Sequence, residues 1–94
     1  MIEWTKQAAG QLDQAYDYIA LSNREDVAVR IMTQIVSTVE KLVTSTQSGR
    51  PGRVPGTREL AIPSTPFIAA YAVQKGRIVI LALYHGAQRW PESF

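Results

Sequence analysis

The sequence has no cysteine, only one histidine and no long hydrophobic run. Without cysteine neither disulfides nor thiolate metal sites can form, and a single histidine cannot assemble an ordinary zinc site. No apolar run approaches the roughly 18 residues of a membrane span, and residues 1–7 lack the features of a signal peptide. No glycine-rich loop leads from a strand into a helix, as nucleotide sites require. These absences predict a cytoplasmic protein with no membrane partner, metal ion or cofactor.

The 94 residues form a single domain, residues 1–94, because a chain this short cannot support two hydrophobic cores. Hydrophobic residues make up 46% of the chain and charged residues 19%, a composition typical of folded globular proteins rather than disordered ones. Since no disulfide can stabilise this small fold, we expect it to depend on its apolar core or on a partner.

Charge is divided unevenly between the two halves of the chain. Residues 1–49 carry four basic and six acidic side chains, a net charge of −2, whereas residues 50–94 carry six basic and two acidic ones, a net charge of +4. A basic half favours an anionic partner, either nucleic acid or an acidic protein segment. The alternative is a solvated loop that happens to be rich in arginine.

Apolar residues recur at three- and four-residue steps in two consecutive segments, which predicts two amphipathic helices. The first helix is expected over residues 6–21, after a cap at Thr5. Ser22 and Asn23 each precede an acidic residue at capping-box spacing, which predicts that a second helix begins there.

The apolar stripe of this second helix runs from Ala28 to Leu42 and stops in the hydroxyl-rich residues 44–48, with Gly49 expected to end the helix. The connection between the two segments is very short, so together they predict an antiparallel helical hairpin.

The second half of the chain has the pattern of strands. Residues 50–56 form a loop by their proline and glycine content, and residues 57–62 and 67–73 are expected to be strands. Residues 74–77 predict a tight turn into a third strand over residues 78–84.

Residues 78–83 are apolar at every position, which favours a central strand buried on both faces, and residues 2–4 are a candidate edge strand. The predicted fold is therefore α+β, with an N-terminal helical hairpin packed on one face of a three- to four-stranded antiparallel sheet. Two helices cover only one face. We expect the other to be covered either by residues 90–94 or by another protein chain.

Four short motifs follow one another in this half of the chain. They are Arg-Pro-Gly-Arg at residues 50–53, Gly-Thr-Arg-Glu-Leu at residues 56–60, a strand that contains Ala-Tyr at residues 70–71, and a run from Leu83 to Pro91 that includes His-Gly-Ala-Gln-Arg. Together with the order of the elements they resemble the RelE/ParE family of bacterial toxins. The resemblance implies the toxin of a type II toxin–antitoxin system, which arrests growth and is neutralised by a cognate antitoxin encoded in the same operon.

The family has two kinds of target, because its RelE-like members cut mRNA on the ribosome and its ParE-like members inhibit DNA gyrase. RNA cleavage needs a base, an acid and cations, and His85, Tyr84 and Arg89 are the candidate catalytic residues. Tyr84 and His85 are consecutive in a strand, however, so they face opposite sides unless the strand ends or bulges there. The alternative for His85 is a strand-end side chain bonded to a backbone carbonyl, and ParE-like members also carry a histidine at this place.

A missing cation favours the ParE-like branch. RelE-like ribonucleases resemble one another in an arginine that opens the strand corresponding to residues 67–73, whereas Phe67 and Ile68 stand there in this chain. Their lysine cluster is also absent. Arg50, Arg53 and Arg58 are present instead, and arginine binds anions but titrates too high to act as a base.

The resemblance thus implies a gyrase inhibitor rather than an enzyme, with Arg50, Arg53 and Arg58 as candidate target-binding residues. The alternative for the first two is an inert linker, and for Arg58 and Glu59, which face opposite sides of their strand, a salt-bridge role. Two other functions stay open: a RelE-like mRNA endoribonuclease whose partners are the ribosome and mRNA, and a degenerate toxin that only binds its antitoxin and helps repress their operon.

Overall fold

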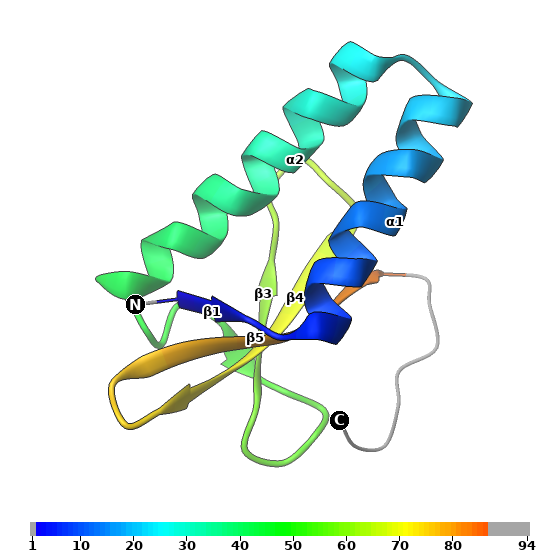
Figure 1. Ribbon diagram of the computed structural model, residues 1–94. Coiled ribbons are helices and arrows are strands. Elements are labelled where there is room, and N and C mark those ends of the chain that lie inside the picture. Colours follow the sequence, from blue (N-terminus) through cyan, green and yellow to red (C-terminus); the bar gives the residue numbers. More distant parts are fainter. Residues whose placement is uncertain (1, 87–94) are drawn as a thin grey trace.

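Two helices pack side by side on one face of a five-stranded sheet (Figure 1). The computed structural model describes residues 2–86. Their elements in chain order are β1 (Ile2–Trp4), α1 (Lys6–Ser22), α2 (Glu25–Glu40), the 3₁₀ turn η1 (Lys41–Val43), β2 (Arg50–Pro51), β3 (Arg58–Ala61), β4 (Phe67–Gln74) and β5 (Arg77–His85). The predicted α+β fold with an N-terminal helical hairpin is confirmed.

Helix α1 begins as predicted, but the cap predicted for α2 is wrong. The hydroxyl of Thr5 accepts a hydrogen bond from the N–H of Ala8 at 3.1 Å. Neither Ser22 nor Asn23 caps α2, whose N-cap residue is Arg24 without a side-chain hydrogen bond. Ser22 lies in the last turn of α1, and the N–H of Asn23 donates to the Ile19 carbonyl and ends that helix. Both residues therefore complete the first helix instead of opening the second.

Gly49 does not end the second helix, contrary to the prediction. Helix α2 ends at Glu40 and continues as the turn η1 to Val43. Gly49 is buried against Tyr71, where a Cβ atom would lie 2.6 Å from the ring. Its N–H donates to the Tyr71 hydroxyl at 2.9 Å, and that hydroxyl donates to the Thr46 carbonyl at 2.8 Å. The glycine is needed for the close approach of the chain to the sheet.

The strand order is β1-β5-β4-β3-β2, so the sheet has five strands rather than the predicted three or four. The edge strand predicted at residues 2–4 is confirmed, but it pairs in parallel with β5, which makes the sheet mixed rather than antiparallel. The additional strand is β2, from Arg50–Pro51, which was expected to be loop and pairs with β3. Proline is tolerated there because β2 is an edge strand.

The hairpin between β4 and β5 turns where the sequence predicted. Lys75 and Gly76 both have positive φ, 50° and 76°, as a two-residue turn of the hairpin type requires. Further along, the pairing shifts from Ala70 with Ala82 to Tyr71 with Ile80, so β5 has one extra residue there, Leu81. This bulge lies well before His85.

Strand β5 is buried on both faces, as predicted. The face toward the helices carries the main core, which includes Ile35, Val39, Leu42, Ile78 and Ile80. The opposite face carries a small cluster of Ala70, Ala82 and Tyr84. Among residues 2–86, no helix is long and apolar enough to cross a membrane.

Candidate functional site

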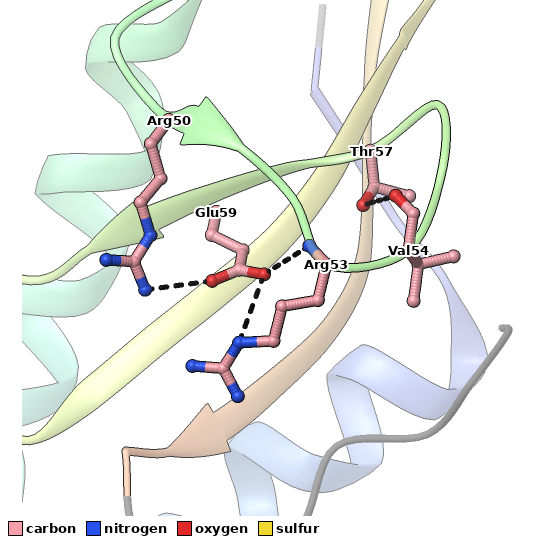
Figure 2. A network of polar contacts seen from close by, with 5 residues as sticks. All are labelled: Arg50, Arg53, Val54, Thr57 and Glu59. Atoms are coloured by element: carbon pink, nitrogen blue, oxygen red, sulfur yellow. Dashed lines mark hydrogen bonds and ion pairs between the residues drawn. The ribbon is translucent and has the colours of Figure 1, made fainter.

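A buried carboxylate organises the face of the sheet opposite the helices. Glu59 lies in β3 beside Ala70 of β4, and its side chain is only 1% exposed. One carboxylate oxygen accepts from Nη2 of Arg50 at 3.0 Å. The other accepts from the backbone N–H of Arg53 at 2.7 Å and lies 3.6 Å from Nε of the same residue (Figure 2). Both oxygens of Glu59 are therefore bound to the loop that precedes its own strand.

The loop between β2 and β3 also closes on itself. The N–H of Gly52 donates to the Thr57 carbonyl at 2.8 Å, and the Thr57 hydroxyl donates to the Val54 carbonyl at 2.6 Å (Figure 2). A side chain at position 52 would collide with Thr57, and Gly56 has a φ of +80°, which favours glycine. Val54 is buried. Together with β2 this loop forms a segment, residues 50–57, whose path is fixed by hydrogen bonds.

Two of the three predicted target-binding arginines meet at this site, and the third lies elsewhere. The side chains of Arg50 and Arg53 are 64% and 49% exposed, although both contact the buried Glu59. Arg58 is directed to the other side of β3, where its Nη1 donates to the Gly49 carbonyl at 2.7 Å. The opposite orientation of Arg58 and Glu59 is as predicted. Within residues 2–86, the site therefore carries two positive charges against one negative charge.

A hollow of about 270 Å³ adjoins the ion pair between Arg50 and Glu59. Apart from these two residues it is lined by Ser48, Leu60, Ala61 and Ile68. The hollow therefore has mainly apolar walls with a guanidinium group at its margin. That combination suits a partner that carries an acidic group next to apolar atoms.

Tyr84 and His85, the two candidate catalytic residues that the structure describes, are not brought together. Tyr84 is buried with Ala70 and Ala82 on the face opposite the helices. His85 is exposed at the end of β5, where its ring makes a T-shaped contact with the ring of Phe67, with 5.8 Å between the centroids. Arg89, the third candidate, lies outside the described residues, as do residues 90–94, one of the two expected covers of the second face.

His85 lines a pocket between α1 and the sheet, together with Gln11, Gln14, Ala15, Tyr18, Phe67 and Leu83. No lysine or arginine is among the described residues around this pocket. Cations are what a site for phosphoryl chemistry needs to stabilise the developing charge. The pocket as described has a histidine and amides, but no such group.

A comparison with known protein families identifies the family of this chain. The family described as "ParE toxin of type II toxin-antitoxin system, parDE" matches residues 2–90. The chain belongs to the ParE toxin family. A relative from Sinorhizobium fredii (strain NBRC 101917 / NGR234), named "Putative toxin Y4kP", is 36% identical over 91 residues, which cover 97% of this chain and 93% of the relative. The predicted resemblance to the ParE-like branch is confirmed.

A solved structure agrees with this assignment. The structure titled "Chromosomal ParDE TA system from P. aeruginosa" superposes with a TM-score of 0.82 at 34% sequence identity, covering 89% of this chain and 92% of that one. This ParE-family chain is therefore a toxin of the type II toxin–antitoxin class, a class whose toxins are paired with a cognate antitoxin.

Sequence reasoning missed the central role of Glu59 in this ParE toxin. The sequence predicts Glu59 only as a salt-bridge residue and Arg50 and Arg53 as target-binding residues, without a contact between Glu59 and the two arginines. One signal was available: Glu59 stands between Arg58 and Leu60 in a predicted strand of a sheet that is apolar on both faces, so a carboxylate there needs a cationic partner. The nearest arginines outside the strand are those of the loop. No cluster of three or more potential metal ligands occurs within residues 2–86.

Proposed function

We propose that this ParE-family toxin arrests growth by inhibiting DNA gyrase, and that an antitoxin encoded in the same operon neutralises it. Family membership supports a toxin in a type II pair. The choice of gyrase over mRNA rests on the chemistry of the residues around His85, because RelE-like relatives would use this region to cut RNA.

The separation of Tyr84 from His85 is the observation that carries the proposal. Cleavage through a 2′-hydroxyl requires a base and an acid on either side of one phosphate, and cations that stabilise its charge. Tyr84 is buried on one face of β5, His85 is exposed at the other, and Phe67 occupies the place where an arginine would be expected. This arrangement favours an inhibitor that binds its target over an enzyme that cuts RNA.

The basic loop supplies a means of binding. Arg50 and Arg53 present partly exposed guanidinium groups next to the hollow of Ser48, Leu60, Ala61 and Ile68. Guanidinium groups bind carboxylates in a bidentate geometry that gives both strength and direction. An acidic surface of gyrase is a suitable partner for this loop, while Arg58, which bonds the Gly49 carbonyl, has a smaller role.

The antitoxin is expected to be acidic where it contacts the toxin. Residues 50–94 carry a net charge of +4, and an acidic segment that orders on binding would neutralise this charge. Because a ligand of the folded state stabilises it by mass action, the melting temperature of the toxin should rise with antitoxin concentration.

The decisive experiment measures both candidate activities on one preparation. Purified toxin should inhibit supercoiling of relaxed plasmid by gyrase, and the antitoxin should restore supercoiling. The variant His85→Gln separates the two functions, since a ribonuclease that used His85 for proton transfer would lose RNA cleavage by roughly 10²-fold or more. Gyrase inhibition involves no such step, so we expect growth arrest by the variant to remain.

A ribosome-dependent cut in mRNA, with supercoiling unaffected, would instead identify the protein as a RelE-like endoribonuclease. If neither activity is found but the antitoxin complex forms and represses its operon, the toxin is degenerate. Either result would contradict gyrase inhibition.

A further inference from the structure

The segment of residues 50–57 is held to the sheet by the pairing of β2 with β3, by the buried Val54 and by one polar side chain, that of Glu59. The backbone N–H of Arg53 donates to Glu59 at 2.7 Å, so Glu59 fixes the path of the chain as well as two side chains. The contacts divide between the two oxygens, because Oε1 binds Arg50 and Oε2 binds Arg53. Figure 2 shows the two guanidinium groups approaching the carboxylate from different sides.

This arrangement holds two like charges close together. Two guanidinium groups repel one another, and without an anion between them their side chains would separate into solvent. Glu59 removes this repulsion and is itself buried, whereas Arg50 and Arg53 keep about half or more of their side-chain surface exposed. Most of the pair is therefore still accessible to a partner.

We propose that Glu59 is a positioning residue for the toxic activity, which presents Arg50 and Arg53 as a preformed pair to an acidic protein surface of the target. This inference rests on the proposed function in so far as the target is gyrase. Ordering a long side chain on binding costs free energy that a preorganised side chain does not lose again. For two arginines, the loss of preorganisation should weaken binding by roughly tenfold.

The variant Glu59→Gln isolates this role because it removes the charge without leaving a buried ion behind. Glutamine is close in size, but its NH₂ group cannot accept a hydrogen bond, so at least one contact to Arg50 or Arg53 is lost. The arginines remain partly exposed and can be solvated. The main core on the helix face does not include Glu59, so the variant should fold.

Glu3→Gln is the matched control. Glu3 also forms an ion pair with an arginine of the sheet, since its Oε1 lies 3.2 Å from Nη1 of Arg77, but both side chains are half exposed and they lie on β1 and β5. The substitution is the same, and the loop of residues 50–57 is not involved.

The experiment combines amide hydrogen exchange with potency. In Glu59→Gln, exchange of the Arg53 amide should accelerate by tenfold or more, and the concentration needed for half-inhibition of gyrase should rise roughly tenfold, with a parallel loss of growth arrest. Glu3→Gln should match the wild type in Arg53 amide exchange, in the concentration for half-inhibition of gyrase and in growth arrest. Growth arrest at the wild-type level in Glu59→Gln overturns the positioning role, whether or not exchange of the Arg53 amide changes.

A second variant, Glu59→Asp, separates position from charge. It keeps the negative charge that balances the arginines but shortens the side chain by one methylene, so it cannot reach all the groups that Glu59 contacts. Positioning predicts that Glu59→Asp stays impaired in growth arrest. Recovery to the wild-type level would show that only the charge matters and would overturn the inference.

Two further outcomes distinguish an error in the proposed target from an error in the proposed role of Glu59. If the wild-type toxin does not inhibit gyrase, the proposed target is wrong, while the growth-arrest and exchange measurements still decide the role of Glu59. Binding to gyrase should also be measured in the absence of DNA. An effect of Glu59→Gln on binding that occurs only when DNA is present would overturn the acidic protein surface as the partner of the two arginines.

Discussion

The two faces of the sheet are built by different means. The face under α1 and α2 is filled by large side chains such as Ile35, Leu42, Ile80 and Tyr71, all fully or almost fully buried. The opposite face has small residues, Ala70 and Ala82 among them, together with Tyr84 and the buried carboxylate of Glu59. The helix face has the larger apolar core, and the opposite face carries the candidate site of Glu59, Arg50 and Arg53.

The two faces therefore contribute differently to the stability of the fold and to the position of the loop. Burial of large apolar side chains is the main stabilising term in small domains and is not directional. Ion pairs and hydrogen bonds add less net stability, but they fix positions. The helix face therefore holds the fold together, and the Glu59 face determines where the loop and its arginines lie.

The largest effect is expected on the helix face. Ile80 is fully buried at the middle of β5, and Ile80→Ala should lower the free energy of unfolding by about 4 kcal/mol through lost burial and a new cavity. Urea denaturation followed by circular dichroism measures this loss. Val73→Ala, at a 45% exposed position of the neighbouring strand, is the control and should cost far less. Equal losses would mean that the helix face does not dominate stability.

A smaller loss is expected when the two loop arginines are removed together. In Arg50→Ala/Arg53→Ala the buried carboxylate of Glu59 keeps only the Arg53 N–H, so the unfolding free energy should fall by about 3 kcal/mol. The same denaturation measurement applies. The sequence alone gives no sign that these two side chains stabilise the fold, and the burial of Glu59 is the reason for this expectation.

Addition of Glu59→Gln to this double variant should restore part of the lost stability, because it removes the unpaired charge. A triple variant as unstable as the double variant would show that the arginines stabilise the fold through contacts other than Glu59. The coupling between the substitutions is read from the cycle of variants.

The smallest effect is expected from the loss of a polar contact on the helix face of the sheet. Tyr71→Phe removes the hydroxyl that accepts from the Gly49 N–H and donates to the Thr46 carbonyl, and should cost about 1–2 kcal/mol. Thermal denaturation provides the measurement, with Tyr18→Phe at an exposed position of α1 as the control. A Tyr71→Phe protein as stable as the control would show that water satisfies these backbone groups.

Regular patterns made most of the fold predictable. The helical hairpin follows from apolar spacing, the turn at Lys75 and Gly76 from glycine, and the central position of β5 from its unbroken apolar run. The parallel pairing of β1 was not predictable, because three residues do not specify a direction. The strand β2 was hidden by its proline, and Gly49 looked like a helix end because its contact with Tyr71 joins distant parts of the chain.

The candidate site was only partly predictable, for a related reason. Arg50, Arg53 and Arg58 were recognisable as a basic group, and the opposite orientation of Tyr84 and His85 followed from strand alternation. What brings the loop onto the sheet is the burial of Glu59, and burial depends on the whole fold. A single carboxylate has the same appearance in a sequence whether it is solvated or buried.

The parallel pair of β1 with β5 has a consequence for how the protein is made. Ile2–Trp4 leaves the ribosome first among the strands and Arg77–His85 last, yet β5 lies between β1 and β4 and joins them. Such pairing between distant parts of a chain is slow to form. A nascent chain that stops before β5 has no sheet that links its first strand to the others. The first strand therefore joins the sheet only after β5 has been synthesised.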